Sequence, residues 1–366
     1  MRLQDRDELA RLFTLRNAEK NRAALAMPAS SLEAAAEPLL AGSGRWDLIL
    51  SNVPAKAGEP VLSDFISRAA GSLKPGGMAL IVAVHTLADF FRARIAEAGA
   101  ELLLERKGSG YSVFAFERGA APEPVEEGAR EGLFSSRPFY LRGIVEREIE
   151  GIPLRIATAH GAPGFDSPGA EAIVAAKMAA RLGPEKFPPG RVVLHEAGQG
   201  FFQCWLVDVL RGRIGRADFP VVLSGRNALA LEAARHNLWE AGRAVDVIPA
   251  ADLEPLRALF PGDCAVVAAF PGLVPQSSLP KGSDQMASFW DDARELLSPG
   301  GILLVAFGSS EAELFDRRKP AGFARLGTLR RDGRRALAYR RAGQSAEGAL
   351  ASEFEGGLSP PSNSTH

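Results

Sequence analysis

The chain has few cysteines and no long apolar stretch. Its two cysteines, Cys204 and Cys264, have the spacing of neither a disulfide framework nor a zinc site, and its five histidines are scattered. No metal site is therefore expected. No apolar run approaches the roughly 18 residues that a membrane-spanning helix needs, and the first residues do not resemble a signal peptide. These absences predict a cytoplasmic protein without a membrane partner.

Neither sign of charge dominates. The sequence has 43 lysines and arginines against 44 acidic residues, for a net charge of −1. Such a chain is not attracted to nucleic acid as a whole, so any RNA contact must come from a local patch. Arginine suits phosphate backbones, although a solvated hairpin would explain an arginine-rich stretch equally well. The candidates for contacts with a nucleic acid are Arg330, Arg331, Arg334 and Arg335.

Three short motifs occur twice in the same order, at a nearly constant spacing of about 220 residues. Three ordered matches at one spacing indicate a duplicated domain. The pairs are residues 5–17 with 225–237, 52–54 with 269–271, and 75–77 with 299–301.

Within each copy, apparent strands alternate with amphipathic helices, which is typical of a mostly parallel sheet covered on both faces. The sequence therefore predicts an α/β fold. In the first copy we expect strands at 48–51 and 79–84, helices at 8–21, 60–73 and 86–98, and a final hairpin at 101–106 and 111–117. The expected organisation is a first domain at 1–118, an acidic linker at 119–137, a second domain at 138–341 and a disordered tail at 342–366.

The first copy is expected to lack its opening strand. In the second copy an apolar strand runs into the glycine turn that contains Gly198 and Gly200, well ahead of Gly225. Gly198 lies further ahead of Gly225 than Met1 lies ahead of Asp5. The first copy should therefore lack both this strand and its glycine loop. The favoured explanation is that the true chain begins further upstream, and the alternative is that this copy has decayed.

A polar turn follows an apolar strand at Asn52-Val53-Pro54. Open α/β sheets bind their ligands at the carboxyl ends of their strands. An Asn side-chain carbonyl and the adjacent backbone carbonyl of Val53 can accept both hydrogens of an exocyclic amine, and Pro54 presets the turn. Lys56 could contact a phosphate or simply be solvated. Alternatively, Asn52 merely caps the turn after the strand.

The order of strand, Asn-x-Pro turn, helix, Pro-Gly-Gly and strand resembles the class I S-adenosylmethionine-dependent methyltransferases. Two such units in one chain resemble the tandem-domain bacterial ribosomal RNA guanine-N2 methyltransferases. The resemblance implies tandem Rossmann-like domains, S-adenosyl-L-methionine as cofactor, and N-methylation of a base amine in ribosomal RNA. It also implies that Asp5 binds the cofactor ribose, although Asp5 or Asp7 could instead cap the following helix.

The chain departs from that family at several positions. Val53 replaces a proline and Ala55 replaces an aromatic residue. In the second copy, the loop acid, the ribose acid and the catalytic Asn are matched to Leu194, Gly225 and Ala269, which leaves Gly198, Gly200 and Asp252 as its cofactor-type residues.

The family's active copy is the C-terminal one, whereas the Asn-x-Pro turn survives here in the N-terminal copy. The alternative function is therefore a catalytically inactive tandem module that binds RNA or a protein. A monomer is compatible with either function.

Overall fold

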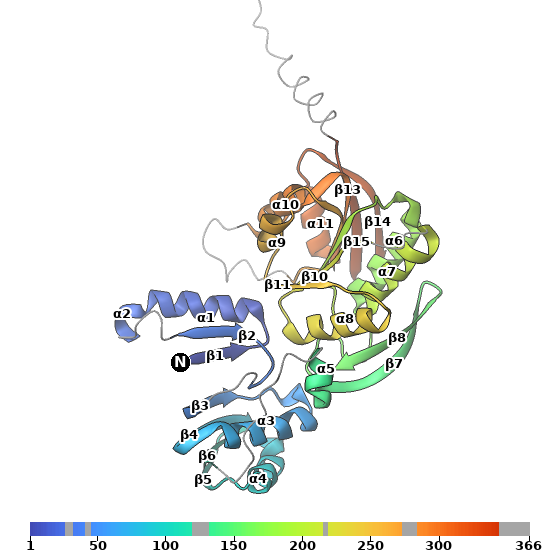
Figure 1. The fold of residues 1–366 in the computed structure, drawn as a ribbon. Helices are drawn as coiled ribbons and strands as arrows, with labels where there is room; N and C mark the ends of the chain where they lie inside the picture. Colours follow the sequence, from blue (N-terminus) through green and yellow to red (C-terminus); the bar gives the residue numbers. More distant parts are fainter. Residues whose placement is uncertain (26–31, 41–44, 119–131, 215–218, 273–283, 344–366) are drawn as a thin grey trace, which may run out of the picture.

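The computed structural model describes residues 1–25, 32–40, 45–118, 132–214, 219–272 and 284–343. Most of the predicted acidic linker, at 119–131, and nearly all of the predicted tail, at 344–366, lie outside these residues. The described part alternates strands and helices along the chain, which confirms the predicted α/β class (Figure 1).

The elements before residue 119, which we call the first unit, contain two separate sheets. β1 pairs in parallel with β2, and four further strands follow the order β3-β4-β6-β5. β3 and β4 are parallel, whereas β6 is antiparallel to both β4 and β5. The strands are β1 (Arg2–Asp5), β2 (Glu33–Ala36), β3 (Trp46–Asn52), β4 (Leu73–Val84), β5 (Leu102–Lys107) and β6 (Tyr111–Glu117). The α-helices are α1 (Glu8–Lys20), α2 (Arg22–Leu25), α3 (Glu59–Ser72) and α4 (Ala88–Glu97).

The elements from residue 133 onward, the second unit, contain one continuous seven-stranded sheet in the order β11-β10-β9-β12-β13-β15-β14. The five strands from β11 to β13 are parallel, and β15 is antiparallel to both of its neighbours. The hairpin of β7 (Leu141–Ile149) and β8 (Ile152–Ala159) precedes this sheet. The sheet strands are β9 (Arg191–His195), β10 (Val221–Gly225), β11 (Asp246–Pro249), β12 (Cys264–Ala269), β13 (Leu297–Gly308), β14 (Phe323–Arg331) and β15 (Arg334–Arg341). The helices are α5 (Leu133–Ser136), α6 (Ala170–Leu182), α7 (Phe201–Ile214), α8 (Ala228–Glu240), α9 (Glu254–Leu259), α10 (Gln285–Leu296) and α11 (Ser309–Arg317).

The first unit repeats the strand order of the second with one strand left out. β2-β1 takes the place of β11-β10, and β3-β4-β6-β5 takes the place of β12-β13-β15-β14. Among the described residues nothing takes the place of β9, the central strand of the second sheet. The described strands of the first unit consequently form two separate sheets (Figure 1).

Each face of the second sheet carries a hydrophobic core. Helices α6, α7 and α8 cover one face, and α9, α10 and α11 cover the other. The first unit has one core, in which α3 and α4 pack on one face of β3, β4 and β6. No hydrophobic cluster covers the opposite face of this sheet within the described residues, so that face stays open.

Helix α8 contributes to a core on each side. Leu231 and Ala234 pack into a core of the second unit, whereas Leu229 and Ala233 pack into the core of the first unit. Figure 1 shows α8 between the second sheet and the first unit. One helix therefore joins the two units through apolar contacts on opposite faces.

A buried amide near the end of α8 ties three elements together. The Asn237 Oδ1 atom accepts a hydrogen bond from the Ala157 amide at 2.8 Å. Its Nδ2 atom donates to the carbonyl oxygens of Ala157 and Gln199, both at 2.9 Å. These bonds fix α8 against β8 and against the turn that follows β9.

Several predictions of local structure differ from the fold. Leu12 and Phe13 of α1 are 41% and 38% exposed, because no further layer covers this helix. The sequence pattern did not predict β2, which pairs in parallel with β1. Glu37 directly follows this strand. The end of the predicted linker forms helix α5, with Phe134 buried. The predicted turn at 74–77 lies within β4.

The pairing of β3 with β4 and of β12 with β13 shows that the predicted match of residues 52–54 with 269–271 is displaced by one residue. A Cβ atom on Gly77 would lie 2.7 Å from the carbonyl oxygen of Trp46, and one on Gly301 would lie 3.0 Å from that of Cys264. These glycines end the same Pro-Gly-Gly segment within β4 and within β13, so the two carbonyls occupy equivalent positions. The equivalent pairs are therefore Trp46 with Cys264 and Asn52 with Phe270, whereas the sequence match of Asn52 with Ala269 is wrong by one residue.

We predict that Asn237→Leu lowers the free energy of unfolding by about 2–4 kcal/mol, measured by chemical denaturation. The variant keeps the branched shape of the side chain but leaves buried peptide groups of Ala157 and Gln199 without partners, at about 1–3 kcal/mol each. The control is Asn17→Leu, because Asn17 lies exposed on α1. Its effect should stay within about 0.5 kcal/mol. Equal effects of the two variants would contradict the role given to the Asn237 amide.

Candidate functional site

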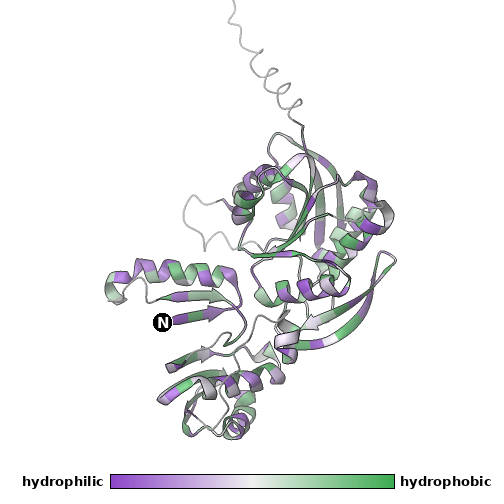
Figure 2. Ribbon diagram, viewed as in Figure 1, coloured by the Kyte–Doolittle hydropathy of each residue, from purple (hydrophilic) through white to green (hydrophobic). Residues whose placement is uncertain are grey.

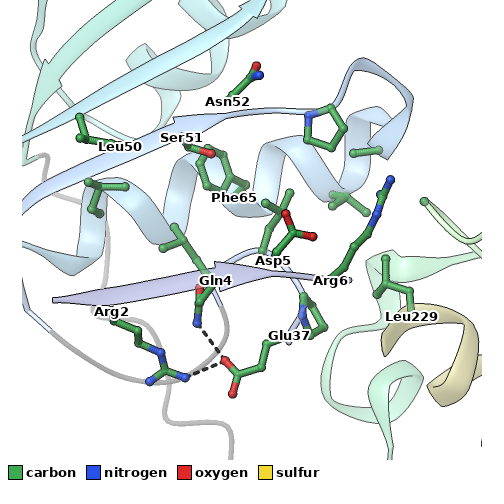
Figure 3. A pocket seen from close by; sticks show the side chains of 18 of the residues that line it. Arg2, Gln4, Asp5, Arg6, Glu37, Leu50, Ser51, Asn52, Phe65 and Leu229 are labelled. Carbon is green, nitrogen blue, oxygen red and sulfur yellow. Dashed lines mark hydrogen bonds and ion pairs between the residues drawn. The ribbon is translucent and has the colours of Figure 1, made fainter. Parts of the chain in front are cut away.

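A cavity of about 480 Å³ lies between β1 and β3 (Figure 3). Its lining includes three residues that the sequence singled out, Asp5, Asn52 and Pro54, together with Glu37 and Ser51. The cavity runs along β1 and β3 from Arg2 and Trp46 to the carboxyl ends of both strands, where Asp5 and Asn52 lie. The structure thus brings the predicted Asn-x-Pro turn and the predicted ribose acid to the rim of one cavity.

The Asn52 side chain is exposed at the end of β3, and no hydrogen bond to it is found among the described residues. Val53 is buried, and its amide donates to the Val82 carbonyl at 3.0 Å, which anchors the turn to β4. The Pro54 carbonyl accepts from the Ala57 amide at 3.0 Å, which begins a short 3₁₀ helix. A fixed backbone and an unengaged amide can together position a ligand amine.

The acids of the first unit are engaged with protein groups. An Oδ1 atom of Asp5 accepts from the Asp7 amide at 2.9 Å, and Asp7 caps α1 through the Leu9 amide, also at 2.9 Å. Asp7 is therefore the helix cap, and Asp5 stabilises the turn before it. Glu37, which the sequence pattern missed, accepts from Arg2 at 2.6 Å and from Gln4 at 2.9 Å (Figure 3).

Lys56 and the four candidate arginines are not among the residues that line this cavity. Lys56 is exposed in the 3₁₀ helix that follows Pro54. Arg330 and Arg331 are exposed near the end of the β14–β15 hairpin, on the second unit. Three arginines have partners there: Arg331 with Asp332, Arg334 with Glu171, and Arg335 with Thr328.

The predicted cofactor residues of the second unit lie at the carboxyl edge of its sheet. Gly198 and Gly200 follow β9 and have φ angles of +84° and +128°, which favour glycine. A Cβ atom on Gly200 would lie 2.7 Å from the Asn237 Nδ2 atom, so this glycine also permits the close approach of α8. Asp252 follows β11 and accepts from the Glu254 amide at 3.2 Å, at the start of α9.

Glu196 is a residue of this edge that the sequence reasoning missed. It follows β9 directly, with a φ of +55°, a conformation that non-glycine residues rarely adopt. Its carboxylate accepts from the Arg226 amide, and burial raises its pKa. The match that put the loop acid at Leu194 is wrong, since Leu194 lies inside β9 and is buried in the core. The Glu-x-Gly-x-Gly spacing of residues 196–200 could have revealed it.

Gln199 was also missed, and it holds the entry loop of the second unit. Its Oε1 atom accepts from the Ala159 amide at 2.9 Å, and its Nε2 atom donates to the Phe165 carbonyl at 2.5 Å. The glycine turn is thereby fixed to β8 and to the loop after it. No sequence pattern marked this residue, because its bonds join segments far apart in the chain.

Arg226 lies where the two units meet. Its guanidinium is 3.6 Å from Asp7 and 3.9 Å from Glu196. Its carbonyl accepts from the Glu8 amide at 2.9 Å, and the Arg6 carbonyl accepts from the Ala228 amide at the same distance. The starts of α1 and α8 are thus bonded to each other, and the carboxyl ends of β1 and β10 face one another.

None of the described helices is both long and apolar enough to cross a membrane. A search of the described residues for three or more His, Cys, Asp or Glu side chains grouped as metal ligands finds none.

The strand order and the parallel crossovers, with the last strand antiparallel, define the Rossmann-like fold of class I methyltransferases. A similar solved structure is that of the Thermus thermophilus 16S rRNA N2 G1207 methyltransferase (RsmC) in complex with AdoMet and guanosine. Its sequence is 18% identical, the TM-score is 0.60, and the match covers 86% of this chain and 78% of that one.

Two further structures are similar to the chain over different shares of its length. TrmN from Thermus thermophilus is 18% identical, with a TM-score of 0.37, over 88% of this chain and 77% of its own. A methyltransferase from Pyrococcus furiosus is 13% identical, with a TM-score of 0.35, over 51% of this chain and 89% of its own. No family model matches the sequence, and no curated protein matches it.

We predict that His195 makes the protein sensitive to acid. Burial at the end of β9 and the positive charge of Arg226 lower its pKa from 6.5 to about 4. A lowered pKa in the folded state gives stability that is present above pH 6.5 and lost as the pH falls towards 4. Between pH 7 and pH 4 the free energy of unfolding should therefore fall by about 3 kcal/mol less in His195→Leu than in the unchanged chain. Denaturant titration at each pH measures this difference. Parallel losses in both proteins would rule out His195 as the source.

Proposed function

We propose that this protein is an S-adenosylmethionine-dependent methyltransferase that methylates a base amine in RNA, most simply ribosomal RNA. The observation that carries the proposal is the placement of Asn52 and Asp5 at the rim of one cavity, at the carboxyl edge of a class I methyltransferase fold. The similarity of fold to a ribosomal RNA methyltransferase supports the choice of substrate.

The proposed chemistry needs positioning more than acid–base catalysis. A planar amine must present its lone pair in line with the sulfonium methyl group, and correct orientation supplies much of the rate. The Asn52 side-chain oxygen and the Val53 carbonyl would accept the two N–H hydrogens, while Pro54 holds the turn. Val53 itself is buried and anchored to β4, so the turn is rigid before the substrate arrives.

The cofactor would lie across the ends of the strands that flank the cavity. Asp5 is the group proposed to meet the ribose hydroxyls, and its other contact is a local one with the Asp7 amide. In the second unit, Glu196, Gly198, Gly200 and Asp252 line the equivalent edge. We assign methyl transfer to the first unit because the second has Phe270 where the first has Asn52.

The repeated strand order also supports two domains that arose by duplication, with boundaries near 1–118 and 138–341. An RNA substrate would place the protein in the cytoplasm. We propose that it acts as a monomer, because α8 already joins the two units within one chain.

We predict that Asn52→Ala lowers the rate of methyl transfer to bulk ribosomal RNA by roughly 10²–10³-fold, as loss of one positioned hydrogen bond does in other active sites. The assay follows transfer of a labelled methyl group from S-adenosylmethionine with the enzyme in excess. Affinity for the cofactor should change little, because Asn52 would face the acceptor. The control is Asn17→Ala on α1, where Asn17 is exposed, and this variant should keep the full rate.

Equal rates for Asn52→Ala and the unchanged chain would show that the active site is wrongly assigned. No transfer above background by the unchanged chain would favour the alternative function, an inactive tandem module that binds RNA or protein. The exposed Arg330 and Arg331 are the observation that favours this alternative.

We predict that Arg330→Ala combined with Arg331→Ala weakens RNA binding and reduces the salt dependence of log K by about 1–2, as loss of one or two phosphate contacts does. Filter binding at several salt concentrations measures both quantities. The control, Arg317→Ala, removes a similarly exposed arginine from α11, where it pairs with Glu313. Identical salt slopes for the double variant and the control would exclude the hairpin as an RNA contact.

A further inference from the structure

The second unit supplies part of the wall of the cavity. Figure 3 shows Arg6 of the first unit next to Leu229 of the second. A Cβ atom on Gly161 would lie 2.9 Å from Arg6 Nη1 and 3.2 Å from Leu229 Cδ1, so this glycine lets the segment after β8 approach both side chains. The lining residues that come from the second unit are Tyr140, His160, Gly161 and Leu229.

His160 is the member of this wall that contacts the end of the Asn-x-Pro turn. Gly58 follows the short 3₁₀ helix after Pro54 and has a φ of +88°. A Cβ atom on Gly58 would lie 2.7 Å from the His160 Cε1 atom, so the imidazole lies directly against the backbone of this glycine. Glycine both adopts this φ and leaves room for the ring. The turn that carries Asn52 thus ends against a side chain of the other unit.

The backbone of His160 is fixed to both units. Its amide donates to the Tyr140 carbonyl at 2.8 Å, and the Tyr140 side chain is buried in the core of the first unit. The Tyr140 hydroxyl accepts from the Leu39 amide at 3.1 Å, in the segment that follows β2. The half-buried ring of His160 therefore has its place before any substrate arrives, as a group that orients a substrate must.

The imidazole suits a base better than a phosphate. Burial and the positive charge of Arg142 lower the pKa of His160, and the opposing effect of Asp166 is smaller. The ring is therefore uncharged at neutral pH, and it offers a planar face instead of a cation. Proteins that hold a single unstacked base combine hydrogen bonds to its edge with a planar side chain against its face.

The other aromatic side chains among the lining residues are placed less well for this role. Phe65 and Tyr140 are packed in the core of the first unit, and each is 2% exposed. Trp46 begins β3, at the opposite end of that strand from the turn. Residues 53–58, which form the turn and its 3₁₀ helix, include no aromatic side chain. A base held by the turn therefore finds its planar neighbour, His160, in the second unit.

We propose that His160 binds the acceptor base by stacking against it, so that one active site is built from both units. Asn52 and the Val53 carbonyl would hold the amine of the base, and the imidazole would hold its face. This assignment rests on the proposed function and adds the residue that selects a planar acceptor. The backbone bonds between the starts of α1 and α8 keep the two units together, and with them the turn and the ring.

The test compares His160→Ala, His160→Phe and His160→Leu. Transfer of a labelled methyl group from S-adenosylmethionine is followed at several concentrations of bulk ribosomal RNA, which gives kcat/KM. We expect His160→Ala to lower kcat/KM by roughly 5–100-fold, as loss of a base-stacking aromatic does in other proteins. His160→Phe should recover kcat/KM to within about threefold because it restores a planar face, whereas His160→Leu, which is bulky but not planar, should not.

The matched control is Ile144→Ala, on the same β7–β8 hairpin. Ile144 is 50% exposed and does not line the cavity, so kcat/KM should stay unchanged. Chemical denaturation of every variant checks that the fold is kept.

A second measurement does not depend on methyl transfer. The ring signals of His160 are recorded by NMR in protein labelled at its histidines, and they are assigned by their loss in His160→Phe. Guanosine and cytidine 5′-monophosphates, whose bases carry an exocyclic amine, are then titrated. At least one should move the His160 ring protons upfield, because a stacked base shields them. Uridine 5′-monophosphate, whose base lacks the amine, should move them less.

Equal kcat/KM in His160→Ala and the unchanged chain, or recovery by His160→Leu as complete as by His160→Phe, would overturn the proposal. So would unchanged ring signals with both amine-bearing nucleotides. Loss of transfer in Asn52→Ala with full activity in His160→Ala would keep the proposed enzyme and reject the stacking residue. Shifted His160 signals without any methyl transfer would keep the base contact and reject the proposed enzyme.

Discussion

Backbone hydrogen bonding across the centre of a parallel sheet determines how this molecule is built. In the second unit β9 satisfies the facing edges of β10 and β12, and seven strands become one surface with a core on each face. The first unit has the flanking strands without the centre. Its two sheets are therefore held by connections other than pairing: the contacts of α8, and the buried guanidinium of Arg137, which donates to the carbonyls of Leu39 and Leu40 at 2.8 Å each.

The two units differ in how much of the hydrophobic surface of their helices is buried. In Figure 2 hydrophilic and hydrophobic residues alternate along α1, and Leu9, Leu12 and Phe13 have the spacing of one helix face. That face is partly exposed at Leu12 and Phe13, whereas the equivalent helix α8 buries both of its apolar faces. The first unit thus keeps the sequence pattern of a covered sheet while one of its covering layers is missing.

Much of the fold could be predicted because it depends on local signals. Apolar runs, the Pro-Gly-Gly turn and the repeat placed nearly every element of the first unit, and the gap itself followed from the position of Gly198 relative to Gly225. β2 was missed because Glu-Ala-Ala-Ala has no strand propensity of its own and forms a strand by pairing with β1. The register error at Asn52 has another cause: the sequence match aligned Pro54 with Pro271, whereas strand pairing places Asn52 and Phe270 in the same position.

The site could be predicted in part, for a related reason. Asn52, Pro54 and Asp5 each follow a strand, so a pattern of strands was enough to bring them to one edge. Glu196 had a readable motif, but a match anchored elsewhere displaced it by two residues to Leu194.

The long-range partners could not be found in this way. Gln199 and Asn237 act through hydrogen bonds to segments that lie far from them in the sequence. Arg226 contacts Asp7 across the boundary between the units. Gln199 and Asn237 hold the glycine turn within the second unit, whereas Arg226 bonds the carboxyl edge of one unit directly to that of the other. The cavity edge of the first unit and the glycine turn of the second are therefore joined through Arg226, which contacts both Asp7 and Glu196.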